Sequence, residues 1–572
     1  MGSFVAVIAP VRGAIRMGLM GLLAGVLMVP TPPSRAAGVK AAPGRLDVAC
    51  DLLADRLAGL GDMRIIKLES VGAGTLKIGA TPVGEHCRLT AAIHERQGAN
   101  GVPYAIGFEM RLPKDWNGRF WYQANGGIDG SVKEASGDAG GGPLTSALAQ
   151  GFVVVSSDAG HENRLTRGPG FGYDPQARLD YGYQTVGSLT PLAKEVIRRA
   201  YGRAPDTSYI GGCSNGGRHA MVAASRYPEQ FDGYLIGAPG FRLPLAAIAN
   251  IFGAQQYAKV ATDRADLSTA FTDAERRTVA DAVLAKCDAL DGLADGMIMA
   301  SRQCQASFDL DKDVPTCQAA RDGSCLSTAQ KQAIGAVFAG ARTSDGKPFY
   351  APFPFDAGVA GSGVKRWEFE APLKLDSGAV AMIFAVPPVD PKGFDGAKFV
   401  LGTPVESMLA SVAASNESFR ESALSFMMPV EPDKLSSAFE RGARIIAYHG
   451  NSDAIFSVAD SMAWIDGLHA NHGGQAGGFA RLFPVPGMDH CRGGPSADQF
   501  DMITPLVRWV EQGDAPASIV ASVRGPGNPG GENPEVPASW SPSRTRLLCP
   551  HPQVAVYDGR GDPEQASSFS CR

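Results

Sequence analysis

Residues 211–217 read GGCSNGG and follow a short apolar run at residues 208–210. Within this stretch Gly212, Ser214 and Gly216 form a Gly-x-Ser-x-Gly pattern, whose small residues allow a strained turn that lifts a serine hydroxyl clear of a sheet. The pattern alone is common by chance in a chain with 70 glycines. The apolar run before it predicts a strand, and residues 218–227 after it predict a helix, which is the context the motif requires. The stretch therefore predicts a nucleophilic serine on a strand-to-helix turn.

Strand and helix patterns alternate on both sides of this turn. The predicted strands are residues 119–122, 152–156, 208–210, 233–236, 443–448 and 481–485, and the predicted helices are residues 183–201, 218–227 and 500–511. Strands that alternate with helices predict a parallel sheet.

The alternation stops between residues 236 and 443, a stretch with four of the ten cysteines and several Gly/Pro clusters. Because strands resume afterwards, an insertion between two strands is favoured over an unrelated tandem domain. We predict an α/β-hydrolase fold in which residues 37–241 and 435–572 form the catalytic domain. Residues 242–434 would form a large inserted lid domain.

The composition narrows the class of protein. Of the 572 residues, 44% are hydrophobic and 19% are charged, which is typical of a globular protein with a sizeable core. The net charge is -5, with 53 basic and 58 acidic residues. Since there is no basic excess to neutralise a phosphate backbone, nucleic acid is not an expected partner.

The N-terminus predicts export. Residues 1–36 contain arginines but no acidic residue, and an apolar run at residues 17–29 precedes small residues. This pattern is typical of a signal peptide cleaved after Ala36. The alternative is a membrane anchor, but the run is shorter than the ~20 residues that a spanning helix needs. We predict a periplasmic or secreted protein with no stable membrane insertion after signal removal.

The ten cysteines all lie beyond residue 49, and an even number in an exported chain predicts disulfides. About 945 pairings are possible, so the sequence leaves the connectivity open. The simplest hypothesis joins sequence neighbours and leaves one long-range pair. It pairs Cys50 with Cys87, Cys287 with Cys304, Cys317 with Cys325, Cys549 with Cys571, and Cys213 with Cys491.

A nucleophilic serine needs a general base and an acid that orients the base, and in this fold class they follow the serine in the order acid, then histidine. Asp453 follows the strand at residues 443–448, and His490 follows the strand at residues 481–485. Both lie where parallel strands end, which is where catalytic groups gather. A disulfide holds its Cα atoms about 5.5 Å apart, so a Cys213–Cys491 bond would keep Ser214 close to His490.

Other acids and histidines compete for these roles. Asp158 and His161 precede the serine, which favours a loop-ordering role. Asp489 adjoins the proposed base and should point away from its ring. His219 lies one turn into the helix after the serine, where packing is favoured. His449 lies near the proposed acid, so a substrate contact stays open beside a core position.

Attack on an ester creates an oxyanion, which needs backbone N–H donors. The amide of Asn215, directly after the serine, is the expected first donor. The second should come from a glycine-rich loop after an early strand, and residues 125–130 read NGGIDG. We choose Gly127, with Gly126 as the alternative donor and a plain turn as the alternative reading of the loop.

These residues resemble the tannase and feruloyl esterase family of secreted serine esterases. The resemblance rests on GCSNGGR at residues 212–218, HGNSD at 449–453 and MDHCRGG at 488–494, and it spans nearly the whole mature chain. A disulfide that bridges the triad is a hallmark of that family, and its five-disulfide pattern is similar to the pairing given above. The family also has a large lid between the serine and the aspartate.

The family's lid binds calcium, and residues 287–297, CDALDGLADGM, are similar to its loop. Three carboxylates within eight residues, with glycines for tight turns, are compatible with a hard cation. A solvated acidic loop is the alternative. The implied ligands of a structural Ca²⁺ are the side chains of Asp288, Asp291 and Asp295 and the carbonyls of Leu293 and Met297. No organic cofactor is expected.

The resemblance implies a secreted esterase that cleaves hydroxycinnamoyl (feruloyl) or galloyl esters through an acyl-enzyme. It also implies that Phe456 binds the aromatic acyl group, and a core position is the alternative for Phe456. A small aromatic ester is therefore the expected partner. The alternatives are a mono(hydroxyethyl) terephthalate hydrolase, a peptidase or acyltransferase, and a binding protein that keeps the fold without catalysis.

Overall fold

A nine-stranded sheet organises the chain in the computed structural model, which describes residues 40–99, 101–140 and 144–572. The predicted signal peptide, residues 1–36, lies outside the described residues. The strand order is β13-β12-β11-β10-β8-β9-β6-β5-β2. The bounds are β2 Arg64–Val71, β5 His86–Gln97, β6 Pro103–Pro113, β8 Arg119–Gln123, β9 Val153–Ser157, β10 Thr207–Cys213, β11 Gly233–Gly237, β12 Arg444–Gly450 and β13 Ala480–Val485.

The six strands that the sequence predicts are β8 to β13, and they form one parallel block. The N-terminal strands β2, β5 and β6 extend the sheet in antiparallel fashion. They escaped prediction because β5 mixes buried and exposed residues, so it lacks the continuous apolar run that identifies a buried strand.

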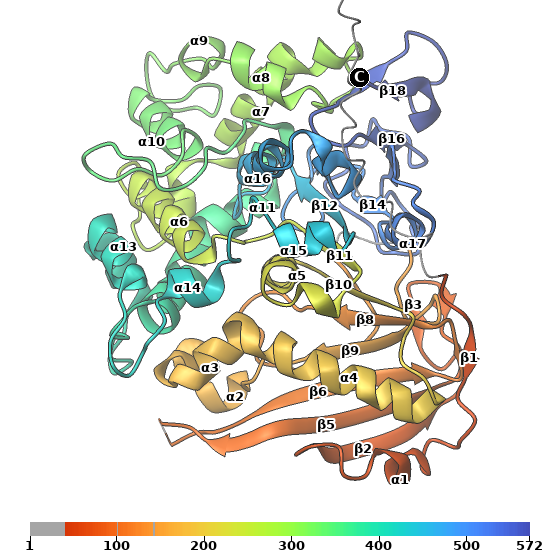
Figure 1. Ribbon diagram of the computed structural model, residues 1–572. Helices are drawn as coiled ribbons and strands as arrows, with labels where there is room; N and C mark the ends of the chain where they lie inside the picture. Colours follow the sequence, from red (N-terminus) through yellow and green to blue (C-terminus); the bar gives the residue numbers. More distant parts are fainter. Residues whose placement is uncertain (1–39, 100, 141–143) are drawn as a thin grey trace, which may run out of the picture. The chain divides into compact units, whose positions relative to one another are not determined.

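The side chains of the parallel strands alternate between two cores. Ile210 of β10 packs in the core formed with α4 (Thr185–Tyr201), α5 (Asn215–Arg226) and α16 (Val458–Asn471). Its neighbour Tyr209 packs on the other face, with α17 (Ile503–Gln512). The sheet is therefore covered on both faces, as a parallel sheet requires. Figure 1 shows α4 crossing the sheet near β6 and β9.

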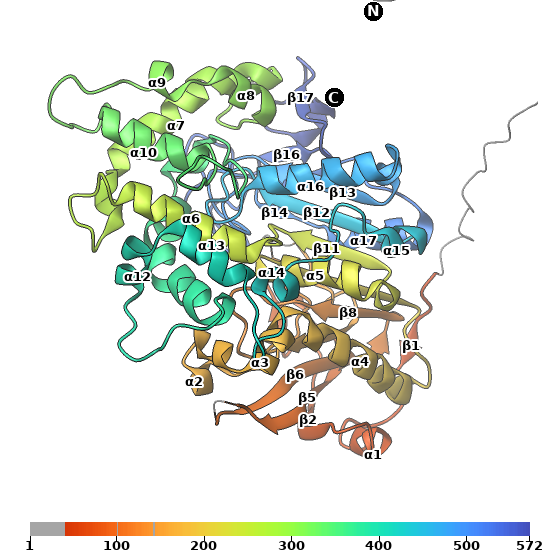
Figure 2. The same ribbon diagram turned by 60° about the vertical axis from the view of Figure 1, so that its left-hand side comes forward.

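The segment between β11 and β12 is helical and adds no strand to the sheet. Its longer helices are α6 (Leu243–Tyr257), α7 (Asp273–Cys287), α10 (Thr328–Phe338) and α13 (Val405–Ala413). Figures 1 and 2 show α6, α10 and α13 gathered on one side of the sheet. Their core also takes in Phe171 and Tyr181 from outside the insertion. The insertion therefore shares a core with the rest of the chain, and its boundaries at residues 242 and 434 stay a prediction.

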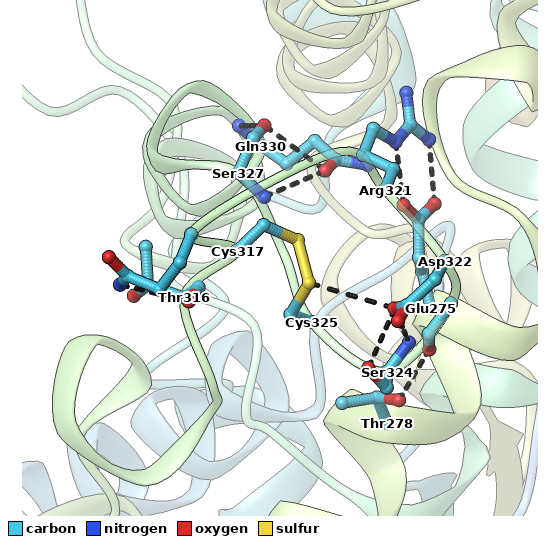
Figure 3. Close-up of a disulfide and its surroundings, with 12 residues drawn as sticks. Glu275, Thr278, Thr316, Cys317, Arg321, Asp322, Ser324, Cys325, Ser327 and Gln330 are labelled. Atoms are coloured by element: carbon cyan, nitrogen blue, oxygen red, sulfur yellow. Dashed lines mark hydrogen bonds and ion pairs between the residues drawn. A yellow bond between two sulfur atoms is a disulfide. The ribbon is translucent and has the colours of Figure 1, made fainter.

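All ten cysteines are paired as sequence proximity predicts: Cys50–Cys87, Cys213–Cys491, Cys287–Cys304, Cys317–Cys325 and Cys549–Cys571. The loop closed by Cys317–Cys325 is also joined to α7. Arg321 pairs with Glu275 through two bonds of 2.6 Å, as Figure 3 shows. Five disulfides are typical of proteins from oxidising, extracytoplasmic compartments. Among the described residues, no helix has the length and apolarity to span a bilayer.

Candidate active site

The predicted nucleophile stands on a sharp turn between β10 and α5. Ser214 has a φ of 67° and a ψ of -128°, a conformation that non-glycine residues rarely adopt. A Cβ atom added at Gly212 or Gly216 would collide with the carbonyl oxygen of Ala124. The two glycines are therefore required because the turn packs directly on the loop after β8.

Asp453 and His490 lie in the loops after β12 and β13, so the parallel sheet places them at the same edge of the sheet as the end of β10. His490 Nδ1 donates to Asp453 Oδ2 at 2.7 Å. The other oxygen, Oδ1, accepts the N–H groups of Ile455 and Phe456, both at 3.0 Å. The carboxylate thus orients the imidazole and is itself held by backbone donors.

The Cys213–Cys491 disulfide joins the residue before the serine to the residue after the histidine, with its Cα atoms 6.0 Å apart. The bond thereby brings the loop of His490 next to the turn of Ser214, across a sequence separation of 278 residues between the two cysteines.

His449 is not available to a substrate, so of the two roles left open for it the structure supports the core position. Its side chain is fully buried. Nδ1 lies 2.8 Å from Ser461 Oγ, and Nε2 donates to the carbonyl of Phe456 at 2.9 Å. Nε2 also lies 3.2 Å from Asp453 Oδ2. Burial opposes ionisation of Asp453, but its bonds to His490 and His449 outweigh this effect and hold its pKa below the ordinary value.

Two aromatic rings meet His490 edge-on. The ring of Phe456 lies 5.3 Å from it and that of Trp367 5.1 Å, between centroids. Phe456 is only 2% exposed, so most of its surface packs inside the protein. Trp367 comes from the inserted segment, in the turn Lys365–Glu370, and it was missed because no motif surrounds it.

The predicted oxyanion loop lies against the nucleophile. A Cβ atom at Gly126 would come within 3.5 Å of Ser214 Cβ, and Gly127 has a φ of 69°. Asn215 begins α5, which places its backbone N–H next to the serine. Both predicted donors, Gly127 and Asn215, therefore lie on segments that border Ser214.

Three of the other competitors, His161, Asp158 and His219, are buried. His161 stacks on Phe171, with centroids 3.8 Å apart, and Asp158 accepts the backbone N–H groups of Gly107 and Gly160, as a loop-ordering role predicts. His219 does more than pack, because its Nε2 lies 2.9 Å from Asp129 Oδ2. No sequence pattern indicated this contact, which spans 90 residues.

The inserted segment also holds the triad loops through one buried carboxylate. Asp356 Oδ1 accepts from Ser452 Oγ at 2.6 Å and from the N–H of Gly487 at 3.1 Å. Ser452 adjoins the predicted acid and Gly487 precedes the predicted base by three residues. The insertion therefore contacts the loops of both Asp453 and His490. No sequence pattern indicated this contact.

The predicted calcium loop is folded back on itself. Asp288 accepts the N–H groups of Asp295 and Gly296, and Asp291 accepts those of Leu293 and Met299. Burial and the neighbouring carboxylates raise the pKa of Asp291 to about 7.

Asp295 itself forms an ion pair with Arg546. In the part of the chain that the structure describes, no three acidic, histidine or cysteine side chains converge as a metal site would require. Carboxylate and carbonyl oxygens are the ligands that a hard cation prefers. One of these carboxylates, that of Asp295, is paired with Arg546.

We expect the Cys213–Cys491 bond to serve the geometry of the site more than the fold. Replacing both cysteines by alanine should lower turnover by about 10²-fold, because small misplacements of reacting groups have effects of this size. The matched control removes Cys317 and Cys325, whose loop lies on the inserted segment. Unchanged turnover in the first variant, measured beside its thermal unfolding, would reduce the bond to an ordinary crosslink.

Comparison with known proteins places these features in a family context. A family model described as tannase and feruloyl esterase matches residues 87–572. Mono(2-hydroxyethyl) terephthalate hydrolase from Piscinibacter sakaiensis is 36% identical to this chain, and the alignment covers 91% of each protein. Feruloyl esterase C from Talaromyces stipitatus is 26% identical over 82% of each protein.

Solved structures show the same fold. Feruloyl esterase B from Aspergillus oryzae matches with a TM-score of 0.72 at 21% identity, over 91% of this chain and 99% of that one. Tannin acyl hydrolase from Aspergillus niger matches with a TM-score of 0.65 at 18% identity, over 93% and 96% of the two chains. The predicted α/β-hydrolase fold is thereby confirmed.

Proposed function

The chain belongs to the tannase and feruloyl esterase family of carboxylic ester hydrolases, and from this premise we propose that it is an exported serine esterase acting on aromatic carboxylic esters. The observation that carries the proposal is the bond between His490 Nδ1 and Asp453 at 2.7 Å, on loops joined to Ser214 by the Cys213–Cys491 disulfide. A binding protein would have no need of this arrangement.

The proposed reaction has two halves. Ser214 Oγ attacks the ester carbonyl while His490 accepts its proton, and Asp453 stabilises the imidazolium that forms. The backbone N–H groups of Gly127 and Asn215 bind the oxyanion. His490 then gives the proton to the departing alcohol, which leaves an acyl-enzyme. A water molecule, deprotonated by His490, releases the aromatic acid and restores the serine.

The proposed acyl group is aromatic, hydroxycinnamoyl (feruloyl) or galloyl, and it would lie near the rings that surround His490. The rings of Trp367 and Phe456 both meet the imidazole of His490, which supports an aromatic environment at the site. The second candidate is a terephthalate monoester, which the 36% identity to mono(2-hydroxyethyl) terephthalate hydrolase favours.

A small substrate panel tests the proposal. The purified mature protein should hydrolyse methyl ferulate or methyl gallate faster than mono(2-hydroxyethyl) terephthalate, and all three faster than the corresponding anilides, because amides are the poorer acyl donors. A preference for the terephthalate ester would select the second candidate. Anilide cleavage at a comparable rate would indicate a peptidase, and no turnover of any ester by folded protein would favour the binding protein.

We also propose that the loop at residues 287–297 binds a structural Ca²⁺. The side chains of Asp288, Asp291 and Asp295 and the carbonyls of Leu293 and Met297 would hold it, and the ion would supply charge compensation within the loop. The observation that supports it is the concentration of carboxylates on a short loop closed by backbone bonds. Asp295 would have to exchange Arg546 for the ion.

Thermal unfolding checks the calcium proposal. After treatment with a chelator, added Ca²⁺ should raise the Tm, because a ligand at one hundred times its Kd stabilises the folded state by about 2.7 kcal/mol. Asp291→Asn should remove this increase. Mg²⁺ at the same concentration is the control, since it prefers a smaller, octahedral site. An identical Tm with Ca²⁺ and with chelator, and no retained calcium on dialysis, would leave the solvated-loop alternative.

The export proposal rests on the five disulfides together with the signal-peptide pattern of residues 1–36. We propose a periplasmic or secreted location, with a small aromatic ester as the partner.

A further inference from the structure

Asp129 is a buried carboxylate that the proposed reaction does not use. Its side chain is 2% exposed, and its φ of 53° is unusual for a residue other than glycine. It lies two residues after Gly127, in the loop that follows β8. Its backbone carbonyl accepts from Asn163 Nδ2 at 2.7 Å, so the loop is anchored on its outer side as well.

The side chain of Asp129 reaches across to the nucleophile helix. Asn215 Nδ2 donates to Asp129 Oδ2 at 2.8 Å, and His219 Nε2 lies 2.9 Å from the same oxygen. Asn215 is the residue whose backbone N–H is the other proposed oxyanion donor. One carboxylate oxygen therefore links the two segments that carry the two donors.

A second set of buried bonds closes this connection from the other side. Asn215 Oδ1 accepts from Arg218 Nε at 2.6 Å, and Arg218 also donates to the carbonyl of Tyr181 at 3.0 Å. The hydroxyl of Tyr181 then donates to the carbonyl of Gly127 at 3.2 Å. The segments that carry Gly127 and Asn215 are thus connected by a closed ring of hydrogen bonds. Within this ring, Asp129 bonds directly from the loop after β8 to α5.

We propose that Asp129 is a positioning residue that sets the separation and orientation of the two oxyanion donors. The inference rests on the proposed function. Preorganised donors act because they are already aimed at the developing charge, and losing one such donor lowers kcat by about 10²- to 10³-fold. Gly127 lies on the loop after β8 and Asn215 begins α5, so their relative position depends on contacts between these two segments. Asp129 supplies the contact that joins its own loop to α5 through a side-chain oxygen.

The experiment compares Asp129→Ala with the conservative Asp129→Asn. The alanine variant removes the acceptor and should lower kcat by about 10²-fold, with KM changed less than about threefold, since ground-state binding does not use the oxyanion donors. The asparagine variant keeps an acceptor oxygen and should recover most of the loss. Asp158→Asn is the matched control, because the Asp158 side chain is also buried but accepts the backbone N–H groups of Gly107 and Gly160 instead of contacting α5.

An inhibitor series separates positioning from a merely structural role. An aryl trifluoromethyl ketone adds to Ser214 and places an oxyanion where the reaction does, whereas the free aromatic acid forms no such adduct. In Asp129→Ala the affinity for the ketone should fall in parallel with kcat/KM, and the affinity for the acid should hold. Equal losses for both ligands would overturn the proposal, and so would unchanged ketone affinity.

Two further variants keep the test decisive. If Asp129→Ala does not fold, Asn215→Ala removes the same contact while it keeps the backbone N–H, and it should show the same selective loss of ketone affinity. Retained esterase activity in Ser214→Ala would contradict the proposed function itself. An inactive Ser214→Ala beside a fully active Asp129→Ala would reject only the role of Asp129.

Discussion

Replacing Ser214 with alanine should lower kcat for the preferred ester by about 10⁶-fold, the size of loss found when a serine hydrolase loses its nucleophile. The alanine side chain has no group to form the acyl-enzyme, and the oxyanion donors alone cannot replace it. The fold should survive, because alanine removes only the hydroxyl and meets the same positive φ of 67° as the serine does. Initial rates and thermal unfolding of both proteins provide the measurement.

The control for this substitution is Ser418→Ala, an exposed serine in the inserted segment. It should leave both rate and Tm unchanged. Labelling with an aryl fluorophosphonate adds an independent readout, since the wild type and Ser418→Ala should react with one equivalent and Ser214→Ala with none. Turnover by Ser214→Ala above about 1% of the wild type, in a preparation free of host esterases, would remove Ser214 from the mechanism.

The sequence was most informative where chemistry demands a local pattern. Gly212 and Gly216 stand on either side of the serine because the carbonyl of Ala124 leaves no room for a side chain. The Gly-x-Ser-x-Gly pattern that results can be recognised in the sequence. The parallel strands were visible because both of their faces are buried. The positions of Asp453 and His490 followed from strand ends and chain order.

What the sequence could not predict depends on contacts between distant segments. Asp129, Asp356 and Trp367 reach the site across the fold, and each lies in a stretch whose local pattern is that of an ordinary loop or turn. The residue type does not indicate whether an acidic side chain is buried at the site or exposed to solvent. The same reason explains why the sequence left the role of His449 open, since its buried contacts with Ser461 and Phe456 depend on the fold.

The inserted segment emerges as part of the site rather than a cover laid over it. Asp356 contacts the loops of both Asp453 and His490, and Trp367 meets the imidazole directly. Because the segment shares a core with Phe171 and Tyr181, its position is coupled to the body of the protein. Substitutions in this segment that alter the substrate preference would therefore have to preserve the contacts of Asp356 with the loops of Asp453 and His490.

Replacing Asp453 with asparagine should lower kcat by about 10⁴-fold, because an amide donor facing Nδ1 favours the wrong tautomer of the catalytic histidine. In this protein the carboxylate has two histidine partners, His490 at 2.7 Å and His449 at 3.2 Å. Only His490 is proposed to move a proton, so His449→Gln, the matched control, should cost far less activity. Equal losses in the two variants would mean that the whole buried cluster, rather than the Asp453–His490 bond, sets the rate.

The same substitution carries a stability prediction with a defined sign. The pKa of Asp453 lies below its ordinary value in the folded protein, so the ionised carboxylate stabilises the fold above the unfolded pKa of about 3.9, and this stabilisation is lost as the pH falls. Asp453→Asn should therefore lower the Tm at neutral pH, and the difference from the wild type should shrink below about pH 4. A difference that grows towards acid pH would mean that the two imidazoles do not stabilise the charged carboxylate, which would contradict its proposed role of holding an imidazolium during turnover.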